Sequence, residues 1–358
     1  MELNLDSEVL KTYGFTKVNT IITLIGMGLI NRTYLLSPVS EENKFILQNI
    51  NTNVFKHPQN IARNLKLIAN YLASKYPDYL FIKPISTISG EEMAFTNGKY
   101  WRLLPYIPNT ISLEVLNEPK QAYEAARQFG KLSRLLADFD ATTLQETIPG
   151  FHDLSLRVDQ FENALKLAST ELKTMAKKQI EDATSQKHLL DYFNSFSHRK
   201  DFPDRVMHHD TKISNVLLDA ETFKGVCVID LDTMMPGKFI SDLGDMMRTY
   251  LCAFSENETD LSKINIRLPY FEAMIKGYLS EMKSILTETE KELILFSGKY
   301  MIYMQALRFL TDFLNGNIYY PINYPAQNLD RAKNQFKLLS ELSINEKELQ
   351  EIIEENLV

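Results

Sequence analysis

The sequence is poor in the residues that build disulfide frameworks and metal centres. Its 358 residues include only two cysteines, which form no CxxC motif, and six histidines, which show neither HxxxH nor HExxH spacing. Cys227 and Cys252 stand in unrelated contexts and offer no ligand set for zinc. Such low cysteine usage is typical of a reducing compartment, so we expect a cytoplasmic protein.

Clustered positive charge and long apolar runs are also lacking. The formal net charge is −7 and no run of five basic residues occurs, which argues against a nucleic acid as partner. The most apolar stretch, residues 21–30, is far shorter than the roughly 20 residues of a membrane-spanning helix. The first ten residues have no signal-peptide core. We expect no membrane contact, and either a monomer or a homodimer.

Two common nucleotide-binding motifs are missing. The chain has no GxxxxGK[ST] sequence, so it is not a P-loop protein. Gly26 and Gly28 lie in GMGLINRTY between two strand-like runs, but no third glycine completes a dinucleotide fingerprint. A glycine turn at this place either covers the phosphates of a nucleotide, together with Asn31, or is an ordinary hairpin turn.

The first hundred residues favour strands with one helix. Residues 57–76 place apolar side chains three and four positions apart, with Pro58 in the first turn, which predicts a helix. Asn97-Gly98 is a strong hairpin signal between two strands. The predicted strands are 20–26, 32–39, 43–50, 79–86, 91–101 and 101–108.

After Pro108 the pattern becomes helical, with one predicted hairpin formed by 215–219 and 225–232. The predicted helices are 118–139, 153–169, 188–197, 287–315 and 327–342. Thr287 and Glu290 form a capping-box pattern at the start of one of them. We therefore predict an α+β, bilobal fold: a small strand-rich lobe, residues 1–107, and a large, mainly helical lobe, residues 108–358. A cleft between two lobes is a common place for a ligand.

The hairpin follows a pattern of polar residues that carries chemistry. His208-x-Asp210 precedes Asn215 by the spacing of the H-R-D-x-x-x-x-N loop of phosphoryl transfer, and Asp230 and Asp232 end the second strand. In such a site one aspartate accepts the proton of the attacking hydroxyl, and the asparagine and a later aspartate hold Mg²⁺ beside ATP. The asparagine spacing alone is common, but the three features together indicate a kinase.

In these motifs the chain resembles the aminoglycoside/choline kinase group of the protein-kinase-like fold. It is most similar to one branch, the N-acetylhexosamine 1-kinases. The resemblance extends from about residue 24 to about 340 and rests on GLINRTYLL, HHDTKISNVLLD, VIDLDTMMPG, SDLGDMMR and LRFLTDFLNGNIYY, among other stretches. It implies transfer of the ATP γ-phosphate to the anomeric hydroxyl of an N-acetylhexosamine.

The resemblance also implies roles for single residues. Asp210 matches the catalytic base, and Lys212 matches a lysine that can contact the transferred phosphate. Asn215 and Asp230 match magnesium ligands, with Asp232 as an acidic neighbour that is less surely a ligand. Substrate-contacting positions correspond to Arg308 and Tyr319.

The sequence also indicates a supporting aspartate, a helical ion pair and the connector between the lobes. Asp242 matches an aspartate that supports the backbone of the catalytic loop. Asp245 is expected to pair with Arg248 three residues later on a helix. The connector between the lobes would bind the adenine edge through its backbone, at Pro105, Tyr106 and Ile107.

One position departs from the family pattern. The strand lysine that holds the α- and β-phosphates should fall where Gln48 stands, and its usual glutamate partner is missing, because residues 57–76 contain no acid. The lysine and its glutamate partner are absent together, as expected, because either charge buried without the other would be costly. Gln48 can still donate to phosphate oxygens, and we considered Arg32, Arg63 and Lys212 as sources of the charge.

Two alternatives stay open at this stage. The acceptor can be choline, an amino-alcohol or an aminoglycoside, because the tyrosines of NIYYPINYP could surround a cation. The protein can also be a nucleotide-binding regulator without turnover, for which Gln48 is the only support.

Overall fold

The computed structural model describes residues 5, 7–27, 31–39 and 43–358. The chain divides into two compact units, which we call the sheet unit and the helical unit. The sheet unit consists of Met1–Thr110, Phe139–Pro149 and Cys227–Pro236, and the helical unit of Ile111–Asp138, Gly150–Val226 and Gly237–Val358. Two segments beyond residue 107 thus belong to the sheet unit, which the predicted division did not anticipate.

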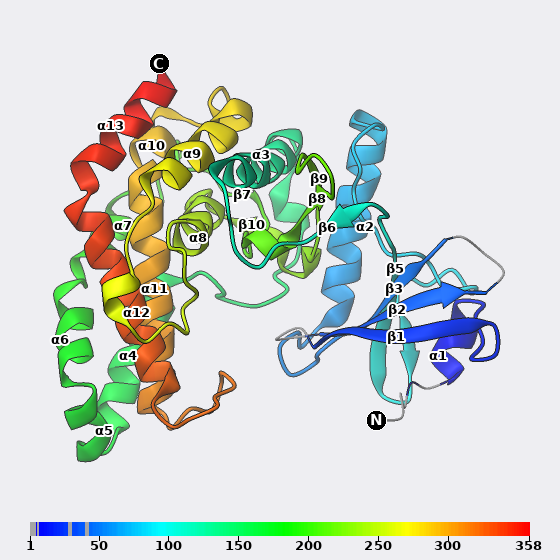
Figure 1. Ribbon diagram of the computed structural model, residues 1–358, viewed down its shortest axis with the longest axis horizontal. Coiled ribbons are helices and arrows are strands. Elements are labelled where there is room, and N and C mark those ends of the chain that lie inside the picture. The colour runs from blue at the N-terminus through cyan, green and yellow to red at the C-terminus, as the bar shows by residue number, and fades with distance from the viewer. Residues whose placement is uncertain (1–4, 6, 28–30, 40–42) are drawn as a thin grey trace. The chain divides into compact units, whose positions relative to one another are not determined.

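The sheet unit is built around five antiparallel strands in the order β1-β2-β3-β5-β4 (Figure 1). The strands are β1 (Thr20–Met27), β2 (Arg32–Pro38), β3 (Phe45–Asn49), β4 (Ala94–Thr96) and β5 (Lys99–Pro105). Successive side chains point to opposite faces of a sheet. Tyr34, Leu36, Leu47 and Leu103 share one buried cluster with Val9 and Leu10 of α1 (Ser7–Thr12), so this face is the core of the unit.

The hairpin signal at Asn97-Gly98 is confirmed. Both residues have positive φ, 48° and 73°, as a two-residue turn between β4 and β5 requires. The strand predicted for residues 79–86 is wrong, because only Ile85 forms a bridge, to Leu103. Gly26 lies in β1 opposite Thr33, just after a shift in register, whereas Gly28 falls outside the described residues.

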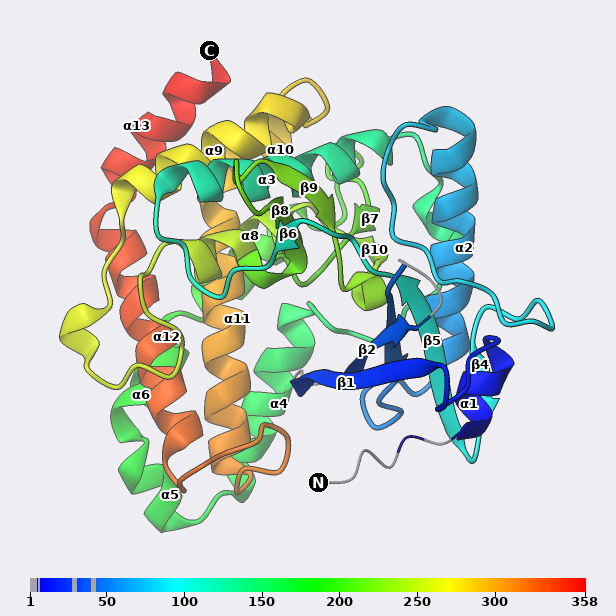
Figure 2. The same ribbon diagram turned by 45° about the vertical axis from the view of Figure 1, so that its right-hand side comes forward.

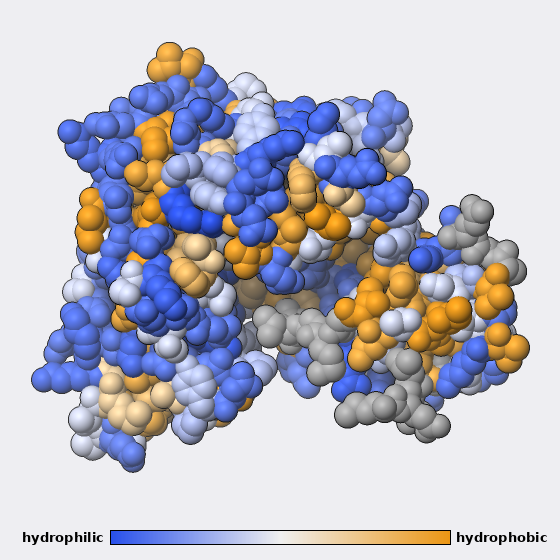
Figure 3. Space-filling view, in the orientation of Figure 1, coloured by the Kyte–Doolittle hydropathy of each residue, from blue (hydrophilic) through white to orange (hydrophobic). Residues whose placement is uncertain are grey.

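The edge strand β1 exposes Ile21, Leu24 and Ile25. Apolar side chains gather on this part of the sheet unit in the space-filling view (Figure 3).

Helix α2 (Pro58–Lys75) confirms the predicted helix with Pro58 in its first turn. It buries Ile61, Leu65, Ile68 and Leu72, the predicted apolar face. The amide of Asn64 on the same helix donates to the carbonyls of Gln145 (2.7 Å) and Met234 (2.9 Å). These bonds join α2 to the two distant segments that complete the sheet unit.

The helical unit is organised around the longest helix, α11 (Ile294–Leu314), which packs against α4, α8 and α12 (Figures 1 and 2). The other helices are α3 (Pro119–Leu135), α4 (Leu154–Leu167), α5 (Thr170–Met175), α6 (Lys177–Ser185), α7 (His188–Phe196), α8 (Ile240–Tyr250), α9 (Leu268–Met282), α10 (Glu288–Glu292), α12 (Gln327–Ile344) and α13 (Glu346–Leu357). The capping box of Thr287 and Glu290 is confirmed, but the helix it opens ends at Glu292, and α11 starts two residues later.

Short elements carry the motif residues. They are β6 (Thr110–Ile111), β7 (Arg205–Met207), the 3₁₀ turn η2 (Ile213–Asn215), β8 (Val216–Asp219), β9 (Gly225–Val228), η3 (Leu231–Thr233) and β10 (Met235–Gly237). The predicted hairpin is present, with its turn closed by a bond from Asp219 N to Lys224 O of 2.9 Å. Within β9 the chain passes from the helical unit to the sheet unit.

Gly244 lets α8 approach α11 closely. A Cβ atom at Gly244 would lie 2.1 Å from the backbone oxygen of Ser297. Any larger residue must push the two helices apart, and α8 also carries Asp242 and Asp245. The contact between α8 and α11 therefore fixes where these carboxylates stand.

We expect Gly244→Ala to lower the free energy of unfolding by about 1–3 kcal/mol, because the added methyl group overpacks a backbone contact. Chemical denaturation measures this loss. Gly130→Ala is the matched control, since a Cβ at Gly130 would meet the backbone oxygen of Tyr278 at 3.0 Å and needs only a small shift. Equal effects of the two substitutions would contradict the account.

Candidate active site

The loop after β7 is held by a buried carboxylate. Asp242, in the first turn of α8, accepts the backbone N–H of His208 (2.9 Å) and of His209 (2.7 Å). Burial raises the pKa of Asp242 to about 7, and the two N–H donors oppose this rise. The expected supporting role of Asp242 is confirmed by these bonds.

The loop has a strained residue at its centre. His209 is buried and has a φ of 65°, in the left-handed region that side chains rarely adopt. A Cβ at Gly237 would lie 2.4 Å from Nε2 of His209, so a side chain there would displace the ring. His208 braces the loop as expected, because its Nδ1 accepts the N–H of Asp210 at 3.2 Å.

A second carboxylate of α8 holds the next residue of the loop. Asp245 accepts the N–H of Thr211 at 2.8 Å and pairs with Arg248, as predicted, at 2.9 Å. Tyr250 donates its hydroxyl to the carbonyl of Thr211 at 3.0 Å. The backbone from 208 to 211 is therefore fixed by one helix face.

Asp210 meets two of the predicted residues. Its Oδ2 atom lies 2.9 Å from Nζ of Lys212 and accepts from Nδ2 of Asn215 at 2.9 Å. Asn215 also donates to the Asp210 carbonyl at 2.8 Å. The Asp210 side chain is 25% exposed, so a reacting group can reach it.

The charge of Asp210 depends on Lys212. Burial opposes ionisation of the carboxyl, but the charge and hydrogen bond of Lys212, with smaller help from His208 and Asn215, more than offset it. The net effect holds the pKa of Asp210 below its ordinary value. Asp210 is therefore an ionised acceptor at neutral pH, as a base in phosphoryl transfer must be.

The asparagine fits a magnesium ligand. Because its Nδ2 donates to Asp210, the Oδ1 oxygen of Asn215 has no donor among the described residues and remains available to a hard cation. Asp230 is half-buried and has a left-handed backbone, φ 58°. In the described part of the chain no three His, Cys, Asp or Glu residues form a metal site. Mg²⁺ does not need one, since it keeps waters and substrate phosphates as ligands.

Asp232 has other partners than a metal. Its Oδ1 pairs with Nη1 of Arg102, and its Oδ2 accepts from Nδ2 of Asn31 at 2.8 Å. The Asp232 side chain is 2% exposed. Both carboxylate oxygens of Asp232 thus have protein partners among the described residues, and its role as a magnesium ligand stays a prediction.

Arg102 is the residue that our reading of the sequence missed. It lies on β5 directly opposite Gln48 on β3, and Gln48 lies opposite Thr33 on β2. Gln48 Oε1 accepts from Nε (2.9 Å) and Nη2 (2.7 Å) of Arg102, and Gln48 Nε2 donates to Thr33 at 3.1 Å. None of Arg32, Arg63 and Lys212, which we had considered, makes these contacts.

The predicted connector leaves β5 at Pro105. Tyr106 donates its N–H to the carbonyl of Lys44 at 3.2 Å, and the carbonyl of Ile107 accepts from Thr110 Oγ1 at 2.8 Å. These bonds define the backbone of the connector, and its contact with adenine stays a prediction.

Aromatic rings lead from the catalytic loop to Arg308 within the helical unit. The rings of His209 and His152 are 5.2 Å apart, and those of His152 and Phe151 are stacked at 4.5 Å. The Arg308 guanidinium lies 5.3 Å from the Phe151 ring centre and 5.6 Å from that of Tyr320. Arg308 thus belongs to a cluster that starts beside Asp210.

Tyr319 does not touch Arg308 itself, and its contact with the substrate stays a prediction. It is 59% exposed and packs edge-on against Tyr320, which makes the contact with Arg308. The backbone of the loop is held by Asp312, which accepts the N–H groups of Ile318, Tyr319 and Tyr320. Tyr320 is therefore the tyrosine that belongs to the cluster.

Two cations in this region lack a counter-ion. Among the described residues, no carboxylate lies within ion-pair distance of Arg157 or Arg308. Burial, followed by the charge of Arg308, lowers the pKa of Arg157. Burial, followed by His209 and Arg308, places the pKa of His152 well below its ordinary value, so His152 is neutral.

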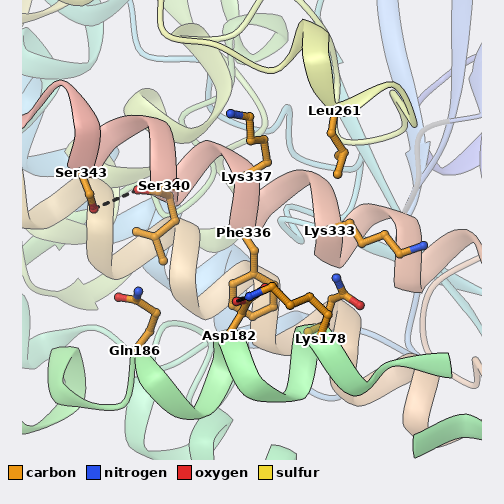
Figure 4. A pocket seen from close by; sticks show the side chains of 11 residues that line it. Lys178, Asp182, Gln186, Leu261, Lys333, Phe336, Lys337, Ser340 and Ser343 are labelled. Atoms are coloured by element: carbon orange, nitrogen blue, oxygen red, sulfur yellow. Dashed lines mark hydrogen bonds and ion pairs between the residues drawn. The ribbon is translucent and has the colours of Figure 1, made fainter. Parts of the chain in front are cut away.

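A groove of about 410 Å³ lies elsewhere, between α6 and α12 (Figure 4). Three lysines line it, but Lys178, Lys333 and Lys337 each pair with an acid on their own helix. The groove contains none of the predicted site residues.

The comparisons with known proteins agree with this chemistry. The model of the phosphotransferase enzyme family matches residues 21–265, more than half of the chain. The protein therefore belongs to the phosphotransferase enzyme family.

Solved structures of similar fold cover nearly the whole chain. A microcompartment-associated aminopropanol kinase has a TM-score of 0.62 at 14% identity and covers 96% of this chain and 97% of its own. A spectinomycin phosphotransferase, solved with ADP and spectinomycin, has 0.61 at 14%, covering 95% and 97%. The choline kinase of Cryptosporidium parvum has 0.54 at 14%, covering 96% of each chain. The predicted kinase-like bilobal fold, a strand-rich N-terminal sheet and a helical C-terminal part, is confirmed.

No helix in the described part of the chain has the length and apolar character to cross a bilayer.

We expect Asp242→Asn to lower the free energy of unfolding by about 1–3 kcal/mol, because the new NH₂ group faces a backbone N–H and leaves it unpaired. Hydrogen exchange of the segment 205–215, read by mass spectrometry, should become faster. Asp312→Asn is the control, since Asp312 also accepts backbone N–H groups but holds another loop. Exchange at 205–215 that changes as much in the control would contradict this role.

Lys212→Met should raise the pKa of Asp210, because burial then acts without its main opposing charge. A raised pKa leaves more of the base protonated in mild acid, so the acidic limb of kcat against pH should move to higher pH. The wild type should keep an ionised Asp210 down to below its ordinary pKa of 3.8. Lys224→Met, on the exposed turn after β8, is the control, and an unmoved limb in Lys212→Met would contradict the coupling.

Proposed function

We propose that the protein is an ATP-dependent kinase that phosphorylates a hydroxyl group of a small molecule, with Asp210 as the base. The single observation that carries this proposal is the ionised, partly exposed Asp210 between Lys212 and Asn215 on a backbone fixed by α8. The hydroxyl oxygen forms a bond to the γ-phosphorus while the bond to the β-phosphate oxygen breaks, and its proton passes to Asp210.

The neighbours of Asp210 have separate roles in this proposal. Lys212 places a positive charge beside the transferred phosphate and keeps Asp210 ionised. Asn215, through Oδ1, and Asp230 would hold Mg²⁺, which neutralises phosphate charge when bound. Positioning and charge, rather than a covalent enzyme intermediate, supply the catalysis.

The nucleotide is expected to meet residues of the sheet unit. Gly26, Gly28 and Asn31 are the residues proposed to cover the phosphates. The backbone of Pro105, Tyr106 and Ile107 is proposed for the adenine. Gln48 is a weaker candidate for a direct phosphate contact, because Thr33 and Arg102 already take its amide.

For the acceptor we propose a neutral sugar, an N-acetylhexosamine phosphorylated at its anomeric hydroxyl. The support is electrostatic: in the described part of the chain Arg157 and Arg308 have no carboxylate partner, and the aromatic faces of Phe151 and Tyr320 already meet a guanidinium. A cationic acceptor would be repelled there, whereas the hydroxyl and amide oxygens of a sugar can accept hydrogen bonds from arginine.

The second candidate acceptor is an amino alcohol or an aminoglycoside. The similar solved structures favour it, since they are an aminopropanol kinase, a spectinomycin phosphotransferase and a choline kinase. At 14% identity this likeness concerns the fold, so the acceptor is a question for experiment.

The test is ADP release from ATP-Mg with N-acetylglucosamine, N-acetylgalactosamine, glucose, galactose, choline, aminopropanol and spectinomycin. We expect turnover with the N-acetylhexosamines, with phosphate on C1 by NMR. Asp210→Asn should lower kcat by about 10²–10⁴-fold and leave ADP binding nearly intact, because only the proton acceptor is lost.

Asp219→Asn is the control for Asp210→Asn, because Asp219 only caps the exposed turn after β8. Turnover with the amines alone would favour the second candidate. A wild type that binds ADP without turnover on any acceptor would favour a regulator instead. Near-normal activity of Asp210→Asn would remove Asp210 as the base.

A further inference from the structure

We infer that Arg102 supplies the positive charge of the nucleotide phosphate site in place of a lysine at position 48, and that Asp232 is its counter-ion. This inference rests on the proposed function, because it names the cation that serves the same nucleotide.

The first observation is the register of the sheet. Thr33, Gln48 and Arg102 form one cross-strand row on β2, β3 and β5, on the face opposite the apolar core. Directly opposed Cβ atoms in such a row are about 5 Å apart. A positive charge moved from position 48 to position 102 therefore remains within one strand spacing of its usual place.

The second observation is that Gln48 suits Arg102 and a lysine would not. Gln48 Oε1 accepts two N–H groups of Arg102, whereas a lysine has no acceptor atom. Two cations at this buried position would also repel each other. A glutamine at position 48 therefore suits an arginine at position 102 on β5, because it offers an acceptor atom and carries no positive charge.

The third observation is the counter-ion. Arg102 is 1% exposed, and its only ionic partner in the described chain is Asp232. A buried guanidinium without a partner would cost several kcal/mol. The helix glutamate that usually pairs with the strand lysine is absent from α2. Asp232, on another segment of the same unit, neutralises the charge of Arg102 instead.

The fourth observation connects this pair to the proposed phosphate ligands. Asp232 follows Asp230 by two residues, and its second oxygen holds Asn31, which in turn accepts the N–H of Asn51 at 3.0 Å. Arg102 uses three of its five N–H groups for Gln48 and Asp232. Because Arg102 is 1% exposed, nucleotide binding must uncover the other two N–H groups before phosphate oxygens can accept hydrogen bonds from them.

The experiment compares binding of ADP-Mg and of adenosine by calorimetry, in the full-length protein. Arg102→Gln should raise the Kd for ADP by about 10- to 100-fold, the cost of a lost charge-assisted hydrogen bond. The Kd for adenosine, which has no phosphate, should stay within about threefold of the wild type. A purely structural loss would weaken both ligands alike.

The decisive variant returns the charge to β3. Gln48→Lys with Arg102→Gln should recover most of the ADP affinity, because lysine at position 48 then faces a neutral partner and can reach Asp232. Gln48→Lys alone should lower the Tm, since it opposes two cations. A folded double variant that binds ADP as poorly as Arg102→Gln overturns the inference.

Asp232→Asn separates a counter-ion from a metal ligand. It keeps the charge of Arg102, so we expect ADP-Mg affinity to stay within about threefold of the wild type or to increase while Tm falls. Weakening of tenfold or more, relieved by raising Mg²⁺, would assign Asp232 to the metal and overturn the counter-ion role.

A matched control and a reserve variant keep the test sharp. Arg205→Gln breaks another buried pair, with Glu290 at 2.8 Å, and should lower Tm without changing the ratio of the two Kd values. If Arg102→Gln does not fold, Arg102→Lys preserves the positive charge, and the double variant Gln48→Lys with Arg102→Gln still measures whether that charge supports ADP binding.

A wild type that binds no ADP would overturn the proposed function and the inference together. ADP binding that Arg102→Gln leaves unchanged would overturn the inference alone.

Discussion

The structure around Asp210 depends on one buried carboxylate. Asp242 accepts two consecutive backbone N–H groups and so holds His209 in a left-handed conformation that a side chain would otherwise avoid. These two hydrogen bonds offset the cost of the left-handed turn at His209. Asp210 then stands at the end of a rigid backbone, and its two polar neighbours, Lys212 and Asn215, reach it at 2.9 Å.

The sheet unit has a comparable buried centre. Asp232 joins Arg102 on β5 to Asn31 before β2, and Arg102 joins β5 to Gln48 on β3. Both centres use a carboxylate to satisfy donors that come from separate segments, which is the condition for burying charge at acceptable cost. They differ in their donors, which are backbone N–H groups at Asp242 and side chains at Asp232.

The region around Arg308, proposed to bind the phosphate acceptor, has a different electrostatic character. Around Arg308 the chain gathers aromatic rings and two guanidinium groups that form no ion pair among the described residues. Burial, followed by the charges of His209 and Arg308, lowers the pKa of His152 and keeps its ring neutral. A field of this sign separates candidate acceptors more sharply than the fold does, since one fold serves many substrates.

The sequence by itself determined much of this protein. Periodicity and turn residues predicted α2, the Asn97-Gly98 hairpin and the capping box of Thr287, because these depend on neighbours along the chain. The spacing of Asp210 and Asn215 picked out both residues as site candidates, and the structure brings them into contact. Only the tertiary structure paired Arg102 with Asp232 and put Tyr320, rather than Tyr319, against Arg308. Those partners are 130 and 12 positions apart. The chain folds η3 back onto β5, and the loop after α11 back onto that helix, and no local sequence pattern contains either contact.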